Sequence, residues 1–444
     1  MEKNLKRILD SYNLSERNKV MQFIVDNPEN LDISELSRIS EIVNSERLKT
    51  AAYYTDYNTL DILEKYLPHI DKKVIRVLEP SAGVGNFIQI IINKYGYADE
   101  LIIDLNDIDC ESIELIKILN EYREIPSNVT INYYNHDFLT HDFKSRYDLV
   151  IGNPPFLRLS KNSGLLKYSK LFNDNITRNM AGFFLQKSLK ISNNSVLILP
   201  KYFLHNSDFS KTRDIAKKYH INAIIDFGEN GFKGVLIETV ALVINTLKDP
   251  DSTLSYSVTK KISNIQKQEK ITSGDFPSWI IYRNDFFDDL VSGMEFYIFK
   301  SFRDRQITNK VLKSKGDIRV IKSRNINRKG TEIINIKGYD VFIEEEDLEK
   351  LSVKKYLNRD DVYLCPNMTY YPRLIKKPDN VVVNGSVAIL ENISDFEITE
   401  DDLKFFSSKT FEEFYRIARN YSTRSLNIDK NSIVFFGLLK KYRD

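Results

Sequence analysis

Four consecutive residues have the types and the order needed for chemistry on an amino group: Asn153, Pro154, Pro155 and Phe156. They follow the apolar run Leu149–Ile151, and prolines end a strand because they lack the backbone donor and fix φ. Methyl transfer to an exocyclic amino nitrogen requires two acceptors that draw its lone pair out of conjugation. The Asn153 side chain and the Pro154 carbonyl supply acceptors, and Phe156 offers a stacking face to a flipped-out base. The alternative interpretation is a rigid turn that only ends a strand.

A small-residue turn lies further upstream, within VIRVLEPSAGVGNF, residues 74–87. Gly83 and Gly85 allow the backbone to approach a ligand closely, as in Rossmann-like nucleoside sites. The spacing is not G-x-G-x-x-G, and no basic residue lies in the turn to meet a pyrophosphate. S-adenosylmethionine (AdoMet) therefore fits better than NAD, although such a turn can also simply pack a helix on a strand.

Acidic residues follow the second predicted strand. Asp107 lies where Rossmann-like sites hold ribose hydroxyls, roughly 20 residues past the glycines, and Ile108 beside it can cover an adenine face. Asp104 is the alternative to Asp107 if the register differs. Asp109 is placed to cap the next helix.

A third predicted strand leads to Asp137 and Phe138. In this position the carboxylate can hydrogen-bond to the adenine of a cofactor and the ring can pack against it. The prediction depends on strand order, because an Asp-Phe pair in isolation has no meaning.

The elements that position these residues alternate between strand and helix patterns. From about 73 to 247, short β-type runs alternate with helical patterns, which predicts an α/β fold with a Rossmann-like, doubly wound, mainly parallel sheet. The last two strand runs, near 221–227 and 239–247, predict an antiparallel hairpin at the sheet edge. We expect a helical N-terminal segment (1–48), a catalytic domain (49–250) and a mixed α+β C-terminal domain (251–444).

Composition describes an ordinary globular protein of 444 residues with 42% hydrophobic residues and a net charge of +2. The two cysteines lie far apart, which suits a reducing cytoplasm and predicts neither a disulfide nor a metal site. No apolar run of about 18 residues and no signal peptide is apparent, so we expect a cytoplasmic protein without membrane spans.

Positive charge concentrates in one segment of the C-terminal half. Residues 300–330 contain eleven Lys or Arg against two Asp. Such an excess is what phosphate contacts require. A solvated lysine-rich face is the alternative interpretation.

Together these motifs resemble the AdoMet-dependent amino-methyltransferases of DNA in the gamma, Taq-like motif order, which occur in restriction–modification systems. The resemblance covers residues 45–250. It implies that Thr55 binds the methionine carboxylate, that Glu79 holds the methionine amino group, and that Phe232 contacts the extruded base. The cofactor turn then comprises Ser81, Ala82, Gly83 and Gly85, with Asp107, Ile108, Asp137 and Phe138 around the ribose and adenine.

The C-terminal half resembles the target recognition domains of this family more loosely. Arg commonly reads guanine and Lys commonly binds phosphate. The candidate DNA contacts are Arg319, Lys322, Arg324, Arg328, Lys329, Tyr370, Arg373 and Arg424. The resemblance implies a site-specific adenine-N6 methyltransferase that acts as a monomer on double-stranded DNA, with a separately encoded restriction endonuclease as a partner.

Three alternatives remain open at this point. Asn-Pro-Pro-aromatic segments also occur in methyltransferases that act on protein glutamine and on ribosomal RNA guanine. Cytosine-N4 methylation is a further option, although serine in place of Asn153 is more usual there. A non-catalytic DNA-binding subunit that keeps the fold is the alternative from a different class.

Overall fold

The chain forms two compact units, Met1–Glu269 (unit 1) and Lys270–Asp444 (unit 2). The computed structural model describes residues 2–43, 55, 57–160, 164–173, 177–231, 237–368, 371–423 and 427–442. The division falls later than the boundary at 250 that the sequence indicates. The reason is that two strands after Pro250 continue the sheet of unit 1.

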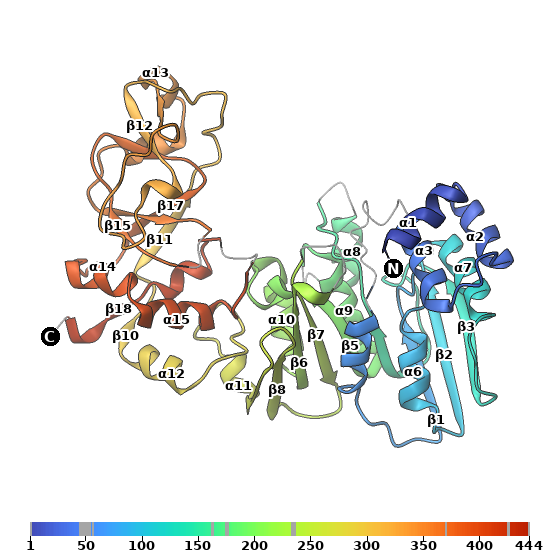
Figure 1. The fold of residues 1–444 in the computed structure, drawn as a ribbon. Coiled ribbons are helices and arrows are strands. Elements are labelled where there is room, and N and C mark those ends of the chain that lie inside the picture. The colour runs from blue at the N-terminus through green and yellow to red at the C-terminus, as the bar shows by residue number, and fades with distance from the viewer. Residues whose placement is uncertain are drawn as a thin grey trace. The chain divides into compact units, whose positions relative to one another are not determined.

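Unit 1 is built on a nine-stranded sheet with the order β3-β2-β1-β4-β5-β7-β6-β8-β9 (Figure 1). Strands β1 to β5 are parallel to one another, whereas β7 runs antiparallel to both β5 and β6. The bounds are β1 Val74–Glu79, β2 Glu100–Asp107, β3 Val129–Asn135, β4 Tyr147–Gly152, β5 Ser192–Pro200, β6 His220–Gly228, β7 Thr239–Asn245, β8 Ser252–Ser257 and β9 Ile262–Lys267. The predicted α/β fold with an antiparallel hairpin is confirmed. Because β8 and β9 extend the sheet, the hairpin is not its edge.

Helices connect the strands and cover the sheet with apolar faces. In α6, Ile88, Ile91, Ile92 and Tyr95 are buried at three- and four-residue spacing, which places them on one side of the helix. Strand β4 is buried along its whole length, as expected for a strand in the middle of a covered sheet. The helical segments are α5 Tyr57–Glu64, α6 Ile88–Tyr95, α7 Cys110–Asn120, α8 Leu165–Leu171, α9 Met180–Ile191 and α10 Ser210–Ala216, with 3-10 turns η2 Lys201–Leu204, η3 Ser207–Phe209 and η4 Glu229–Gly231.

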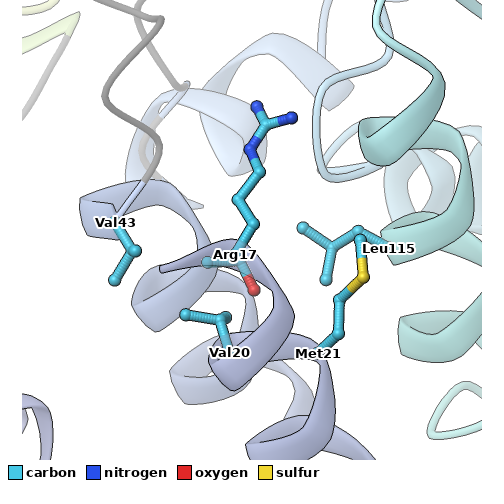
Figure 2. A pocket seen from close by; sticks show the side chains of 6 residues that line it. Arg17, Val20, Met21, Val43 and Leu115 are labelled. Carbon is cyan, nitrogen blue, oxygen red and sulfur yellow. The ribbon is translucent and has the colours of Figure 1, made fainter. Parts of the chain in front are cut away.

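Three N-terminal helices, α1 Glu2–Ser11, α2 Arg17–Asp26 and α3 Ile33–Val43, are part of unit 1. Their apolar side chains form one core cluster with Leu115 of α7 and with Val84. Figure 2 shows Val20 and Met21 of α2 facing Leu115 around a small gap. The gap has room for one water molecule at most, at about 10 Å³, so it is a packing feature and not a ligand site.

Two polar contacts brace these helices against the site described below. Arg17 of α2 forms ion pairs with Asp109 at 2.5 Å and Glu111 at 2.6 Å. The buried Glu41 of α3 accepts a hydrogen bond of 2.7 Å from Asn86, which directly follows the glycine turn. The N-terminal helices thus hold the turn after β1 and the start of α7 in place.

Unit 2 is a mixed α+β unit with three small sheets, as the sequence predicts. The sheet orders are β10-β18, β11-β17-β14-β15 and β13-β12-β16. The strands are β10 Met294–Glu295, β11 Phe299–Arg303, β12 Ile318–Ile321, β13 Val341–Ile343, β14 Val362–Pro366, β15 Ile375–Lys376, β16 Val381–Val383, β17 Val387–Asn392 and β18 Leu438–Leu439. The helices are α11 Gln268–Ile271, which crosses the division between the units, α12 Asp285–Ser292, α13 Glu345–Leu348, α14 Glu400–Phe406 and α15 Lys409–Ala418, with 3-10 turns η5 Ser323–Asn325, η6 Ser352–Tyr356, η7 Ser432–Phe435 and η8 Lys440–Tyr442.

Two apolar clusters form the core of unit 2. One is aliphatic and includes Val320, Ile343 and Ile389 of the sheets. The other is aromatic, with stacked or edge-on rings such as Phe287 against Phe414 at 4.7 Å between ring centroids. Within the described residues of both units, no helix is long and apolar enough to cross a membrane.

Candidate functional site

The sheet of unit 1 has a topological switch point between β1 and β4. The chain continues from β1 towards β2 and β3 on one side and from β4 towards β5 on the other. Open α/β sheets bind ligands at such a point, outside the carboxyl ends of the strands. The predicted cofactor turn follows β1 and the predicted catalytic segment follows β4, so both reach the same edge of the sheet.

The turn after β1 is held by its own backbone and by the next strand. Ala82 N–H donates to the carbonyl of Asn106 at 3.0 Å, and Gly83 N–H donates to the Asp107 carboxylate at 2.9 Å. Gly85 has φ of +75°, and a Cβ there would lie 2.7 Å from the Ile88 side chain. Only glycine fits that position, which explains the spacing of the motif.

Glu79 at the end of β1 is a buried carboxylate with an unused oxygen. Its side chain is 1% exposed, and Oε2 has no hydrogen-bond partner among the described residues. Burial raises the pKa of Glu79 well above its usual range, the nearby Asp107 raises it further, and Arg123 opposes the shift. A ligand ammonium group would satisfy the orphaned oxygen, so this site fits the amino group of AdoMet.

Asp107, and not Asp104, reaches the site. Asp104 is 1% exposed inside the sheet, where Tyr147, Asn132 and Arg76 donate hydrogen bonds to it at 2.8, 2.8 and 3.3 Å. Asp107 lies at the carboxyl end of β2 and accepts from the backbone N–H of Gly83 in the turn and from that of Asp109. Of the two carboxylates, only that of Asp107 contacts the turn after β1, and its role towards the ribose stays a prediction.

The two residues after Asp107 differ in what they contact. Ile108 is 67% exposed, so its side chain is available to cover a ligand ring. Asp109 caps α7 by accepting from the backbone N–H of Glu111 at 3.2 Å and from Ser112 Oγ at 2.8 Å.

Asp137 and Phe138 follow β3 and are already engaged. Asp137 accepts from Lys167 at 2.8 Å and from Tyr168 at 3.3 Å, both on α8. Burial alone would raise the pKa of Asp137, but the Lys167 hydrogen bond and charge outweigh it and the pKa is lowered. The Phe138 ring is 2% exposed and packs against Phe184 at 4.8 Å between centroids, so its face is not open to an adenine.

The segment Asn153–Phe156 directly contacts the cofactor turn. Ser81 Oγ donates to the backbone carbonyl of Asn153 at 3.3 Å, and the Asn153 amide donates to Thr55 Oγ1 at 3.3 Å. Thr55 itself is buried, and its carbonyl accepts from Asn86 at 3.3 Å. Ser81 and Thr55, two of the predicted cofactor residues, therefore each lie within hydrogen-bond distance of Asn153, the predicted catalytic residue.

The remaining part of the segment is rigid and enclosed. Pro154 is buried and Pro155 half-buried. Phe156 is 5% exposed, so a base can stack on it only after the ring or its covering residues move. The predicted stacking role of Phe156 stays a prediction.

Asn179 is a residue that the sequence analysis missed. It is 2% exposed and caps α9, accepting from Ala181 N–H at 3.1 Å. Its amide nitrogen donates to the carbonyl of Phe156 at 2.9 Å and to the Tyr202 hydroxyl at 3.3 Å. An asparagine before a helix is a visible capping signal, but its contact with the segment after β4 depends on tertiary structure.

A buried ionic group was missed as well. Lys201, directly after β5, is 3% exposed and pairs with Asp226 at 2.9 Å and Glu238 at 3.3 Å. These residues lie at the same sheet edge as the site, from β5, β6 and the residue before β7. Such a buried network fixes the ends of three strands relative to one another.

Two of the predicted DNA contacts in unit 2 are committed to its own framework. Arg319 pairs with Asp340 at 3.3 Å, with each side chain 20% exposed. The Arg373 guanidinium donates to three main-chain carbonyls at 2.7 to 3.0 Å, those of Ile326, Asn327 and Tyr371. We therefore assign both arginines to holding loops in place, a role that the order of residues does not reveal.

Other predicted contacts have exposed or stacked cations. The Lys322 ammonium lies 3.7 Å and the Arg324 guanidinium 4.8 Å from the ring centroid of Tyr339. Arg328 and Lys329 are exposed. Phe232, Tyr370 and Arg424 lie outside the described residues, as do residues 49–54 and 56 beside Thr55. Among the described residues, no group of three or more His, Cys, Asp or Glu side chains is arranged to hold a metal ion.

Comparison with known proteins connects the chain with restriction–modification enzymes. The model of the Eco57I restriction-modification methylase family matches residues 27–232. A curated relative, the type II methyltransferase M.AccI of Acinetobacter calcoaceticus, is 27% identical over 374 residues, which are 78% of this chain and 61% of the relative. The chain thus spans about three fifths of the length of that relative.

Solved structures of restriction–modification enzymes are similar to this chain in fold. The type IIG restriction endonuclease BpuSI matches 92% of this chain and 61% of its own, with a TM-score of 0.51 and 14% identity. A type I restriction-modification methyltransferase subunit from Streptococcus thermophilus matches 57% of this chain and 65% of its own, with a TM-score of 0.45 and 16% identity. Residues 27–232, which carry the switch-point site, are therefore similar to Eco57I-type restriction-modification methylases.

Proposed function

We propose that the protein is a site-specific DNA methyltransferase that transfers the methyl group of AdoMet to the N6 amino group of an adenine flipped out of duplex DNA. The observation that carries the proposal is the meeting of Asn153 with Ser81 and Thr55 at the β1–β4 switch point. This meeting brings an amino-group acceptor and a nucleoside-type site to one edge of the sheet. The match to the Eco57I restriction-modification methylase family supports the same reading.

The residues around the switch point fit AdoMet in a consistent order. Glu79 holds the methionine ammonium through its orphaned Oε2, and the Asp107 carboxylate accepts from the ribose hydroxyls. The turn Ser81–Gly85 allows close approach of the backbone, and Ile108 covers the adenine face. When bound, AdoMet supplies a methyl carbon made electrophilic by the sulfonium.

Asn153 and Pro154 prepare the amino group of the target base. The Asn153 side-chain carbonyl and the Pro154 backbone carbonyl accept one hydrogen each from the amino group. Two such hydrogen bonds favour a pyramidal nitrogen, whose lone pair is then available for attack. In the present structure the Asn153 amide nitrogen donates to Thr55, so the amide keeps a defined orientation before the base arrives.

Rigid support makes this arrangement effective. The two prolines fix the backbone after β4, and Asn179 holds the carbonyl of Phe156 from the other side. A proton on the methylated nitrogen is acidic and leaves to water, so no strongly basic side chain is required. Unit 2 is proposed to recognise the target sequence, and a separately encoded endonuclease is the proposed partner in a restriction–modification system.

The test uses purified protein, tritiated AdoMet and mixed-sequence duplex DNA, followed by mass spectrometry of the digested nucleosides. We expect label in DNA as N6-methyladenine. Label as N4-methylcytosine would reject the choice of base, and label in RNA or protein but not in DNA would reject the substrate. AdoMet binding without any transfer would favour a non-catalytic subunit. Long-read methylation mapping in cells that express the protein then gives the recognised sequence.

A further inference from the structure

Unit 2 contains a cavity of about 440 Å³ between two loops and the start of α15. Its lining includes Arg328, Tyr371, Ser408, Lys409 and Glu412. The volume lies within the range of sites that bind small molecules or parts of larger ones. Of these residues, only Arg328 was expected to bind a ligand from the sequence.

Two cations at this cavity have no partner of opposite charge among the described residues. The Arg328 guanidinium lies 4.1 Å from the ring centroid of Tyr371 but makes no hydrogen bond or ion pair with another described residue. Lys409, which is exposed, also makes none within the described part of the chain. The one carboxylate of the lining, Glu412, is paired with Arg416 at 2.7 Å. The cavity therefore carries an excess of positive charge.

Hydrogen bonds and close packing hold the walls of the cavity in place. Arg373 connects the carbonyls of Ile326 and Asn327 to that of Tyr371, so the two loops are held together. Gly330 has φ of +69°, and a Cβ there would lie 2.7 Å from Ser407 Oγ between α14 and α15. The loop that carries Arg328 is thus fixed against both neighbouring segments.

The chemistry of the lining favours a phosphate. A guanidinium offers a planar fork that matches phosphate oxygens, an ammonium offers a point charge, and Arg328 and Lys409, which carry these groups, line the same cavity. Lys409 is the first residue of the ten-residue helix α15, whose positive end adds to the field. The contact with the Tyr371 ring restricts the Arg328 side chain, which lowers the entropy lost when an anion binds.

We propose that this cavity binds a phosphate group of the DNA backbone and so fixes the register of unit 2 on the duplex. The proposal rests on the proposed function, because it takes DNA as the partner. It adds Lys409 as a contact and predicts that Arg328 positions the protein on DNA without reading a base. Phosphate contacts of this kind carry no sequence information but set the salt dependence of binding.

The test compares Arg328→Gln, Lys409→Gln and the double variant with wild type in DNA binding by fluorescence anisotropy over a series of salt concentrations. The slope of log K against log salt is negative and should become less negative by about 0.9 when one phosphate contact is lost, equally for specific and mixed-sequence duplexes. Lys315→Gln is the matched control, because Lys315 is exposed, lies in the same basic segment and does not line the cavity. An equal effect of Lys315→Gln would overturn the proposal in favour of a diffuse basic face.

A second arm distinguishes the source of the phosphate. Wild type and the double variant are titrated with inorganic phosphate and with a free nucleotide in the absence of DNA. Loss of small-anion binding in the double variant, with an unchanged DNA salt slope, would overturn the DNA assignment. Melting temperature and AdoMet affinity should not change, since both side chains are exposed and belong to unit 2, whereas the switch point belongs to unit 1. Methylation with an unaltered slope would contradict only the cavity, whereas an altered slope without methylation would contradict only the proposed activity.

Discussion

The charged side chains at the switch point of unit 1 are enclosed, whereas several in the loop after β12 of unit 2 are exposed. At the switch point Asp107 is bonded to backbone N–H groups, and Glu79 is enclosed with one oxygen left over. In unit 2 the cations divide into those that hold the fold, such as Arg373, and those that face outward, such as Arg328 and Lys329. An enclosed set of acceptors suits a small ligand of fixed shape. An open set of cations suits a polymer with repeated charges.

The largest effect on activity is expected for Asn153, at the enclosed site of unit 1. Asn153→Ala should lower kcat of DNA methylation by about 10²–10³-fold, because one of the two groups that stabilise the transition state is removed. The affinity for AdoMet should change by less than about 3-fold. Single-turnover kinetics and equilibrium binding measure the two quantities separately. Equal labelling of DNA by variant and wild type would contradict the assignment.

Glu79 tests whether the enclosed carboxylate recognises a cation. Glu79→Gln keeps the size of the side chain and should weaken AdoMet binding by about 3 kcal/mol, the usual cost of removing one partner of a buried charged pair. Burial raises the pKa of Glu79 in the free protein, and an ammonium ligand, which stabilises the ionised carboxylate, lowers it again. Wild-type affinity should therefore rise with pH up to that raised pKa, with proton release on binding.

Calorimetry in two buffers of different ionisation enthalpy measures the released proton. The Glu79→Gln variant should release none and show affinity that does not vary with pH in the same range. A wild-type binding enthalpy that is the same in both buffers would show that Glu79 is already ionised, against the burial argument.

Arg373 and Arg328 sharpen the division between cations of the framework and cations that face a partner. Arg373→Gln should lower the free energy of unfolding of unit 2 by about 2 kcal/mol or more, since three carbonyls lose a charged donor. Arg328→Gln should change it by less than about 0.5 kcal/mol. Trp279, the single tryptophan, is buried in unit 2, so its fluorescence in a urea titration reports that unit alone. Equal free energies of unfolding for the two variants would contradict the assignment of Arg373 to the framework and of Arg328 to a partner.

Asn179 is expected to give the smallest effect. Asn179→Ser keeps a helix cap but cannot reach the Phe156 carbonyl, so kcat should fall about 10-fold, near 1.4 kcal/mol, with AdoMet affinity unchanged. Hydrogen exchange should become faster at Leu159, whose amide donates to the Arg178 carbonyl at 2.7 Å. Asn284→Ser at the start of α12 is the matched control, because Asn284 caps a helix and lies in unit 2. The same loss of kcat in both variants would show that Asn179 acts only as a helix cap and does not position the Phe156 carbonyl.

Much of unit 1 was predictable because its signals are local. Alternating strand and helix patterns gave the α/β fold, and strand ends gave the places of Glu79, Asp107 and Asn153. The choice between Asp104 and Asp107 was not predictable, since it depends on the end of β2 and on neighbours from β3 and β4. The division after Glu269 was also missed, because pairing of β8 with β6 is a non-local event.

The sequence of unit 2 predicted less. Positive charge between 300 and 330 is a compositional fact, and composition does not distinguish Arg319, which pairs with Asp340, from Arg328, which has no such partner among the described residues. Lys409 lies about 80 residues from Arg328 in the sequence and joins the same cavity only through folding. No periodicity or motif in the sequence predicts that these two residues line one cavity.

By itself the amino-acid sequence determined which chemical groups are present and which of them end a strand, because proline, glycine and apolar periodicity act on the backbone within a few residues. Tertiary structure decided which groups meet. In the folded chain Ser81 donates to the Asn153 carbonyl, and Asn179 donates to the Phe156 carbonyl. Arg373 donates to main-chain carbonyls of unit 2, whereas Arg328 is exposed. The physical reason is that a side chain's role depends on the desolvation and partners that only packing between distant segments supplies.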